Sequence, residues 1–263
     1  MFVFNTVVIA THRRSGTQWA IDALRKNSPD ISDTYMALEQ MEADHDAAIT
    51  LANFRRQLLN LEGKVLINVN DLPSAGSWNG LDERLFARTI LKNSPTIYVH
   101  RDGRDVMVSL YYYMRSFSET VRNQSFARFL RGESTMAGVD SGFSRPGFWA
   151  YHVQSWMDKV NLLAVSYDDI ESDYEATVRR MADFLNVTLN ENLQPVSALG
   201  RHDGDSKIDS MLGRLGMRLG RSSPPAGPRI GRSGDWRSLF DRRDREFFMK
   251  EAGDMMRRLG YEK

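Results

Sequence analysis

The chain has 263 residues, with 35 basic and 34 acidic side chains and a formal net charge of +1. This balance argues against the strongly basic surface that broad nucleic-acid binding uses, so we expect no nucleic-acid partner. Cysteine is absent, which excludes disulfides, cysteine-ligated zinc and thiol nucleophiles. No stretch approaches the ~18 consecutive apolar residues of a membrane span. We therefore expect a globular cytoplasmic protein without a membrane partner.

Four short apolar runs rich in β-branched residues are predicted to be buried strands. In chain order they are Phe2–Ala10, Lys64–Val69, Thr96–His100 and Leu162–Ser166. Helical patterns predict helices over Gln18–Lys26, Met36–Leu61, Leu81–Leu91, Asp105–Phe117, Ser125–Arg131, Gly147–Lys159, Asp168–Leu185 and Arg242–Leu259. Because strands alternate with helices, we expect one α/β domain over residues 1–263, with a central parallel sheet flanked by helices on both faces.

The stretch from residue 200 to residue 234 differs from the rest of the chain. It is rich in glycine and holds seven Lys and Arg residues against three acidic ones. Long loops within compact α/β domains are uncommon and are usually functional or disordered. We therefore expect a mobile basic lid over residues 200–234.

The first strand passes directly into a helix through the segment THRRSGTQW, residues 11–19. Free N–H groups at a helix N-terminus attract anions, and Gly16 allows the backbone to approach one closely. Ser15 and Thr17 add hydroxyl donors, and Arg14 adds a positive charge. Thr17 stands where a Walker A motif has its lysine, which disfavours an ordinary ATPase or GTPase. The alternative is a capped helix with an exposed basic turn, and this segment alone does not decide between the two.

Two further segments could hold a second anion. The segment YVHRDGRDVMVS places Arg101 at the end of a strand, where open α/β sheets bind ligands, and Ser109 two helical turns later. Near the C-terminus, Arg229–Trp236 (RIGRSGDW) has Gly and Arg residues spaced to surround a phosphate. Taken singly, the first is better explained as a surface network with Asp102 and Asp105, and the second as a flexible linker.

Taken together and in this order, the three segments resemble the sulfotransferase family that uses 3′-phosphoadenosine 5′-phosphosulfate (PAPS). THRRSGTQW resembles its 5′-phosphosulfate loop, YVHRDGRDVMVSLYYY its 3′-phosphate strand and helix, and RIGRSGDW its RKGxxGDW loop. Val165–Ile170 is similar to the strand end that carries the family's YED. The resemblance is strongest to soluble bacterial small-molecule members. It implies a P-loop-like fold and sulfuryl transfer to a hydroxyl or amine of a small organic acceptor, with 3′-phosphoadenosine 5′-phosphate (PAP) as product and no metal requirement.

The resemblance also implies roles for single residues. Arg14 takes the position of the lysine that touches the bridging oxygen of the phosphosulfate. Trp19 would stack on adenine and Tyr167 would line the adenine pocket, although both are otherwise typical core aromatics. The cofactor-binding set that the resemblance implies is Arg13, Arg14, Ser15, Gly16, Thr17, Gln18, Trp19, Arg101, Ser109, Tyr167, Arg229, Gly231 and Arg232.

The sequence departs from the family at the catalytic base. The family often has KTHLP after the second strand, with the histidine as base, and this chain has NVNDLP. Asp71 takes the histidine position when the two are aligned on Leu-Pro, and Asn70 takes it if one residue is inserted. Asparagine cannot accept a proton, so Asp71 is the first candidate, and His12 on the phosphosulfate loop is the second. Arg13 or Arg14 would replace the charge of the missing lysine. Asp71 could instead cap the turn before Leu-Pro.

The acceptor pocket would draw on aromatic side chains, most of which could equally pack in the core. The candidates are Trp78, Tyr112, Phe117, Phe143, Phe148 and Trp149. Two other functions fit parts of the pattern: an ATP-dependent small-molecule kinase and a non-catalytic nucleotide-binding protein. The missing Walker A lysine and the lack of a clear magnesium ligand count against the kinase. A homodimer is compatible with the sequence.

Overall fold

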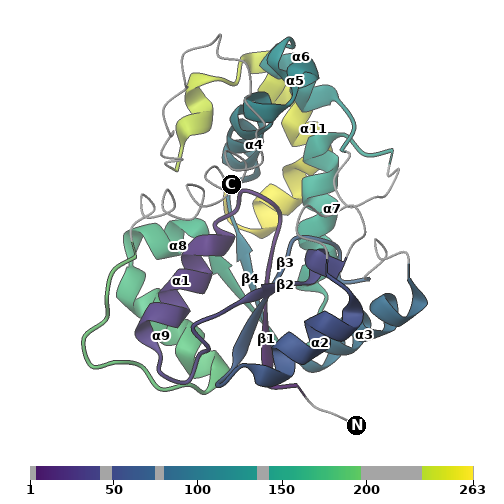
Figure 1. Cartoon of the computed structure of the whole chain (residues 1–263). Coiled ribbons are helices and arrows are strands. Elements are labelled where there is room, and N and C mark those ends of the chain that lie inside the picture. The colour runs from purple at the N-terminus through teal and green to yellow at the C-terminus, as the bar shows by residue number, and fades with distance from the viewer. Residues whose placement is uncertain (1–3, 42–48, 75–79, 135–141, 197–232, 263) are drawn as a thin grey trace.

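The structure is a computed structural model that describes residues 4–41, 49–74, 80–134, 142–196 and 233–262 (Figure 1). Of the expected lid, only its last two residues fall within these ranges. The lid over residues 200–234 therefore lies almost wholly outside the described residues and stays a prediction. The same holds for Trp78 and for the site residues Arg229, Gly231 and Arg232.

The described residues form a five-stranded parallel sheet in the order β2-β3-β1-β4-β5. The strands are β1 (Thr6–Thr11), β2 (Met36–Ala37), β3 (Val65–Val69), β4 (Thr96–His100) and β5 (Leu162–Ser166). The central strand β1 lies between β3 and β4, which the chain reaches on opposite sides of it. Parallel sheets bind ligands at the carboxyl edge of such a switch point, and the segment THRRSGTQW begins there.

The helices lie close to the predicted ranges, apart from two exceptions described below and the short helix α5, which was not predicted. They are α1 (Thr17–Asn27), α2 (Leu51–Asn60), α3 (Leu81–Asn93), α4 (Gly103–Phe117), α5 (Glu119–Arg122), α6 (Phe126–Arg131), α7 (Arg145–Met157), α8 (Tyr167–Ser172), α9 (Tyr174–Leu185) and α11 (Arg242–Arg258), with the 3₁₀ turns η1 (Leu38–Met41) and η3 (Asp235–Ser238).

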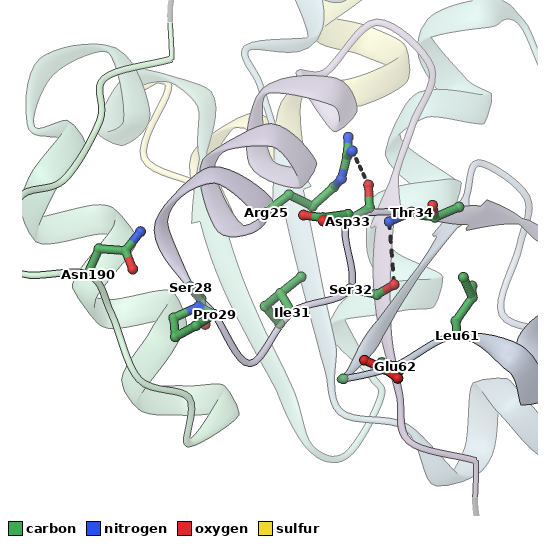
Figure 2. A pocket seen from close by; sticks show the side chains of 11 residues that line it. Arg25, Ser28, Pro29, Ile31, Ser32, Asp33, Thr34, Leu61, Glu62 and Asn190 are labelled. Atoms are coloured by element: carbon green, nitrogen blue, oxygen red, sulfur yellow. Dashed lines mark hydrogen bonds between the residues drawn. The ribbon is translucent and has the colours of Figure 1, made fainter.

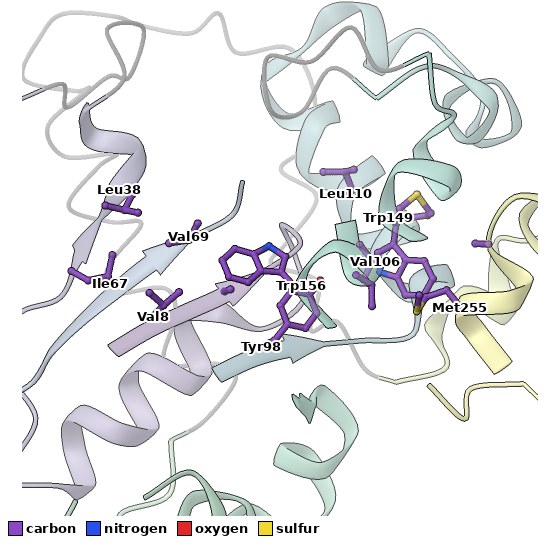
Figure 3. Close-up of a cluster of buried hydrophobic side chains, with 14 of the residues drawn as sticks. Val8, Leu38, Ile67, Val69, Tyr98, Val106, Leu110, Trp149, Trp156 and Met255 are labelled. Atoms are coloured by element: carbon purple, nitrogen blue, oxygen red, sulfur yellow. The ribbon is translucent and has the colours of Figure 1, made fainter. Parts of the chain in front are cut away.

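Both faces of the sheet are buried beneath helices. Successive side chains of a strand point to opposite faces, so Val7 and Ile9 pack with α1, α8 and α9, whereas Val8 and Ala10 pack with α2, α3, α4 and α7. Figure 1 shows α1, α8 and α9 on one side of the strands and α2, α3 and α7 on the other. In Figure 3 the ring of Tyr98 on β4 lies against Trp156 of α7. The predicted α/β fold with a helix-covered parallel sheet is confirmed.

Two helix predictions were wrong in detail. The single helix expected over Met36–Leu61 is divided, in its described part, into β2, η1 and α2, because Met36 pairs with β3 and Thr50 caps a new helix through the amide N–H of Asn53. The helix expected over Asp168–Leu185 is interrupted at Asp173, whose carboxylate caps α9. Side chains that bond to nearby backbone compete with continued helix in this way.

Candidate active site

The turn between β1 and α1 depends on a glycine. Gly16 has φ 106°, in the left-handed region, and a Cβ there would lie 2.7 Å from Cδ2 of Tyr167. Its carbonyl accepts hydrogen bonds from the backbone N–H groups of Trp19 and Ala20 at 3.1 and 3.3 Å. The turn therefore stays tight against the end of β5, and the N-terminus of α1 lies at the carboxyl edge of the sheet.

A buried hydroxyl in this turn indicates a ligand. Ser15 is 1% exposed, and its Oγ has no hydrogen-bond partner among the residues that the structure describes. Buried polar groups are rarely left in this state, and an anion oxygen at the N-terminus of α1 would satisfy it. By contrast, Thr17 Oγ1 pairs with Thr11 Oγ1 at 2.5 Å, and Gln18 bonds to Tyr35 and to an aspartate of its own helix. Of these side chains, Ser15 is therefore the one that a bound anion would satisfy.

Arg14 brings the segment THRRSGTQW into contact with the segment YVHRDGRDVMVS. Its Nε donates to Ser109 Oγ on α4 at 3.2 Å, and its guanidinium carbon lies 4.7 Å from the centre of the Tyr113 ring. The side chain is exposed, as is that of Arg13. Two residues that are 95 positions apart in the sequence thus meet at the carboxyl edge of the sheet.

A second group gathers around Tyr167, at the end of β5. Arg101, at the end of β4 and 3% exposed, has its guanidinium carbon 4.4 Å from the centre of the Tyr167 ring. The ring of Trp19 meets Tyr167 edge-on at 5.0 Å, and its Nε1 donates to the carbonyl oxygen of Val196 at 2.6 Å. Trp19 and Tyr167 are both buried, as core aromatics would be. Their contact with adenine stays a prediction.

The segment RIGRSGDW, of which the structure describes the last four residues, docks on α4 through Asp105. Its carboxylate accepts the backbone N–H groups of Gly234 and Trp236 at 2.7 and 2.9 Å. Burial raises the pKa of Asp105, and these two hydrogen bonds oppose that effect. Asp102 pairs with the buried Arg104 at 2.7 Å, so the surface network considered for this segment is in fact buried. The sequence analysis did not predict that Asp105 holds the C-terminal segment or that Asp102 pairs with Arg104. The alternation of Arg and Asp in RDGRD was the sequence feature that could have indicated these pairs.

The first candidate base, Asp71, follows β3 directly and is 5% exposed. Its Oδ1 accepts a hydrogen bond from the N–H of Leu72 at 2.7 Å. This bond caps the turn before Leu-Pro, which is the alternative role considered for Asp71. Its backbone carbonyl accepts Nε1 of Trp156 at 3.0 Å. The carboxylate is therefore held in one orientation at the carboxyl edge of the sheet, where β1 also ends.

The second candidate base, His12, is a buried neutral imidazole. Nδ1 lies 3.0 Å from the Arg13 carbonyl oxygen, which can only accept, so Nδ1 carries the proton and Nε2 is the basic nitrogen. Burial lowers the pKa of His12 from 6.5 to about 4. The ring lies 5.4 Å from that of His152 and 6.0 Å from that of Phe148. His12 is thus unprotonated at neutral pH, as a base must be.

Among the residues that the structure describes, the aromatic candidates for the acceptor pocket differ in their surroundings. Trp149 is fully buried against Phe248 and is a core residue. Phe148 is buried beside His12, whereas Phe117 and Phe143 are exposed. A separate pocket, shown in Figure 2, lies at the opposite, amino edge of the sheet and is lined by none of the predicted site residues.

No group of three or more His, Asp or Glu side chains that could hold a metal ion occurs in the described part of the chain. No described helix is long and apolar enough to cross a membrane.

Gly16→Ala is expected to prevent tight nucleotide binding and to lower the melting temperature. The new methyl group would overlap the Tyr167 ring, and the left-handed backbone would be strained. Calorimetry with PAP and a thermal melt measure the two effects. Gly142→Ala is the matched control, because Gly142 also has positive φ but has no atom within 4 Å of its added Cβ. Equal effects of the two substitutions would contradict the assigned role of Gly16.

Comparison with known proteins identifies the family. The model of the sulfotransferase domain family matches residues 4–260. Mouse sulfotransferase 2B1 is 25% identical over 247 residues, covering 89% of this chain and 66% of that protein, and mouse sulfotransferase 2A6 is 23% identical over 269 residues, covering 95% and 84%. The chain thus spans just under two thirds of the length of the first relative.

Solved structures agree in fold. Mouse sulfotransferase SULT7A1 in complex with PAP superposes with a TM-score of 0.60 at 17% identity, covering 97% of this chain and 86% of that one. Retinol dehydratase in complex with retinol and PAP superposes with a TM-score of 0.56 at 18% identity, covering 97% and 82%. The predicted family and fold class are confirmed: this chain belongs to the sulfotransferase family.

Proposed function

We propose that this chain, as a single domain over residues 1–263, transfers the sulfuryl group of PAPS to a hydroxyl or amine of a small organic acceptor. The observation that carries the proposal is the meeting of distant motif residues at one edge of the sheet. Arg14 contacts Ser109, and Arg101 stacks on Tyr167 beside the turn that contains the orphaned Ser15 hydroxyl. Family membership and the PAP-bound structural relatives support it.

Bound PAPS would supply an activated sulfuryl group, and the protein residues would position it. The Ser15 hydroxyl and the N–H groups at the start of α1 would hold the 5′ end, and Arg101 and Ser109 the 3′-phosphate. The acceptor oxygen or nitrogen would bond to sulfur while the bond from sulfur to the bridging oxygen breaks, and the electron pair of that bond would leave on PAP. Arg14 would stabilise that developing negative charge. Asp71, or His12 as second candidate, would take the acceptor proton, a contribution typically worth ~10²–10⁴-fold.

PAP is expected to bind at least ~10-fold more tightly than AMP. The two nucleotides differ by the 3′-phosphate, and a hydrogen bond to a charged group contributes about 1.5–3 kcal/mol. Isothermal titration calorimetry compares the two. Arg101→Met, which keeps much of the side-chain volume but removes the charge, should weaken PAP binding and leave AMP binding nearly unchanged. Equal affinities of the wild-type chain for PAP and AMP would remove the basis for a 3′-phosphate site.

The activity itself is tested by screening alcohols, phenols and amines with PAPS for products that have gained the mass of a sulfuryl group. We expect at least one acceptor to be sulfated in the presence of EDTA. Turnover that uses ATP and is lost in EDTA would instead indicate the kinase. PAP binding without turnover on any acceptor would indicate the non-catalytic protein. The cytoplasmic location and the homodimer stay predictions, the second of which light scattering of the purified chain would test.

A further inference from the structure

Asn70, the first residue after β3, is held by three other parts of the chain. Its side-chain oxygen accepts the hydroxyl of Thr11 at 3.1 Å, and its backbone N–H donates to the buried carboxylate of Glu39 at 2.5 Å. Its carbonyl lies 3.1 Å from Nε2 of His152. Since a carbonyl only accepts, Nε2 of His152 carries the proton, and Nδ1 accepts the hydroxyl of Tyr98 at 2.9 Å.

These bonds lead in one direction to the sulfuryl side of the site. The Thr11 hydroxyl donates its hydrogen bond to Asn70. In the 2.5 Å bond between Thr11 and Thr17, the Thr11 oxygen is therefore the acceptor. Thr17 is the first residue of α1 and directly follows the turn that contains Ser15. A directed chain of hydrogen bonds therefore joins the turn at the N-terminus of α1 to the residue after β3.

In the other direction the bonds lead to the candidate base. Asp71 follows Asn70, and its carbonyl accepts Nε1 of Trp156. His152 and Trp156 are one helical turn apart on α7, so one face of this helix holds two consecutive carbonyls of the turn. The turn is thus fixed from α7 on one side and from β1 on the other.

We propose that Asn70 is a positioning residue, which through Thr11 and His152 sets the turn carrying Asp71 against the turn that would hold the sulfuryl group. The inference rests on the proposed function and deepens it. Asn70 itself need not touch either substrate, because it would act through the two turns that it joins. A misplacement of about 1 Å between reacting groups can cost ~10²-fold in rate. Loss of one link should therefore reduce turnover far more than it reduces stability.

Thr11→Val tests the link, because valine keeps the shape of threonine and removes the hydroxyl. Thr6→Val is the matched control: Thr6 lies on the same strand at its other end, is buried like Thr11, and bonds through its hydroxyl to Ser94 Oγ at 2.7 Å. Both variants lose a buried hydroxyl, so similar falls in melting temperature are expected. Only Thr11→Val should lower kcat by ~10-fold or more, measured well below both melting temperatures. Wild-type kcat in Thr11→Val, or an equal loss in Thr6→Val, would overturn the proposal.

Thr11→Val breaks two hydrogen bonds, one to Asn70 and one to Thr17. Asn70→Ala shows which of the two bonds accounts for the fall in kcat. It leaves the bond between Thr11 and Thr17 in place, so affinity for PAP should stay within about threefold of wild type while kcat falls. If both substitutions break one link, the double variant Thr11→Val/Asn70→Ala should lose no more kcat than the worse single variant. If the fold-losses in kcat of the two single variants multiply in the double variant, Thr11 and Asn70 act independently and the proposal is overturned.

The proposed function and the role of Asn70 are contradicted by different results. Absence of sulfuryl transfer by the wild-type chain on every acceptor would remove the proposed function and this inference with it. Transfer by wild type together with unchanged kcat in Asn70→Ala would remove only the inference.

Discussion

Asp71→Asn is expected to lower kcat by at least ~100-fold while affinity for PAP stays nearly unchanged. Asparagine has the shape of aspartate, and its Oδ1 can still accept the N–H of Leu72, so the turn cap survives. The substitution removes the negative charge and with it the ability to take a proton. Steady-state kinetics with an identified acceptor and calorimetry with PAP measure the two quantities, and an unchanged melting temperature shows that the fold is intact.

Two further variants separate the roles of Asp71 and His12. Asp71→Ala removes the cap as well as the base and should destabilise the chain by about 1 kcal/mol, as loss of a capping side chain does. In His12→Asn the amide can replace Nδ1 as donor to the Arg13 carbonyl, while the basic Nε2 is lost. If Asp71→Asn keeps wild-type turnover and His12→Asn does not, His12 is the base and the first assignment is wrong.

The free energy of unfolding is expected to fall steeply below pH 6.5. Burial lowers the pKa from 6.5 to about 4 in His12, about 4 in His100 and about 3 in His152. Between these values and 6.5 the unfolded chain binds protons that the folded chain does not. As the pH falls, each histidine then lowers the free energy of unfolding by up to about 1.4 kcal/mol per pH unit. The three together lower it by up to about 4 kcal/mol per pH unit. Above pH 6.5 they are neutral in both states, and their contribution is constant.

Summed from pH 6.5 to pH 5 the loss is about 6 kcal/mol, within the range of the whole stability of a typical domain, about 5–15 kcal/mol, so a large fall in stability is expected at pH 5. Urea titrations at pH 7, 6 and 5, followed by tryptophan fluorescence, measure it. Asp105, whose pKa is raised by burial, opposes the loss as it becomes protonated in the folded state. His100→Gln, which can still bond to the hydroxyl of Tyr261, removes one titrating group and should reduce the slope by about a third. Stability that is the same at pH 7 and pH 5 would show that the three imidazoles are not buried in neutral form.

The sequence determined the features of the fold that depend on local patterns. Four strands were predictable because a buried parallel strand is a short run of apolar, β-branched residues. β2 was not, because two residues carry no periodic signal and Met36 becomes a strand residue only by pairing with β3. The break at Asp173 was missed for a similar reason, since a capping side chain within a helical pattern alters the hydrophobic periodicity little.

The sequence also indicated which edge of the sheet carries the site, because the carboxyl ends of parallel strands share one edge. On that ground Arg14, Arg101 and Ser109 could be expected to lie near one another. The order of the strands and the packing of α4 and α7 decided which atoms meet. The contact between Arg14 and Ser109 spans 95 positions, and that between Asn70 and His152 spans 82. Such pairs arise only when separate elements pack, and no periodicity within either element encodes the partner in the other.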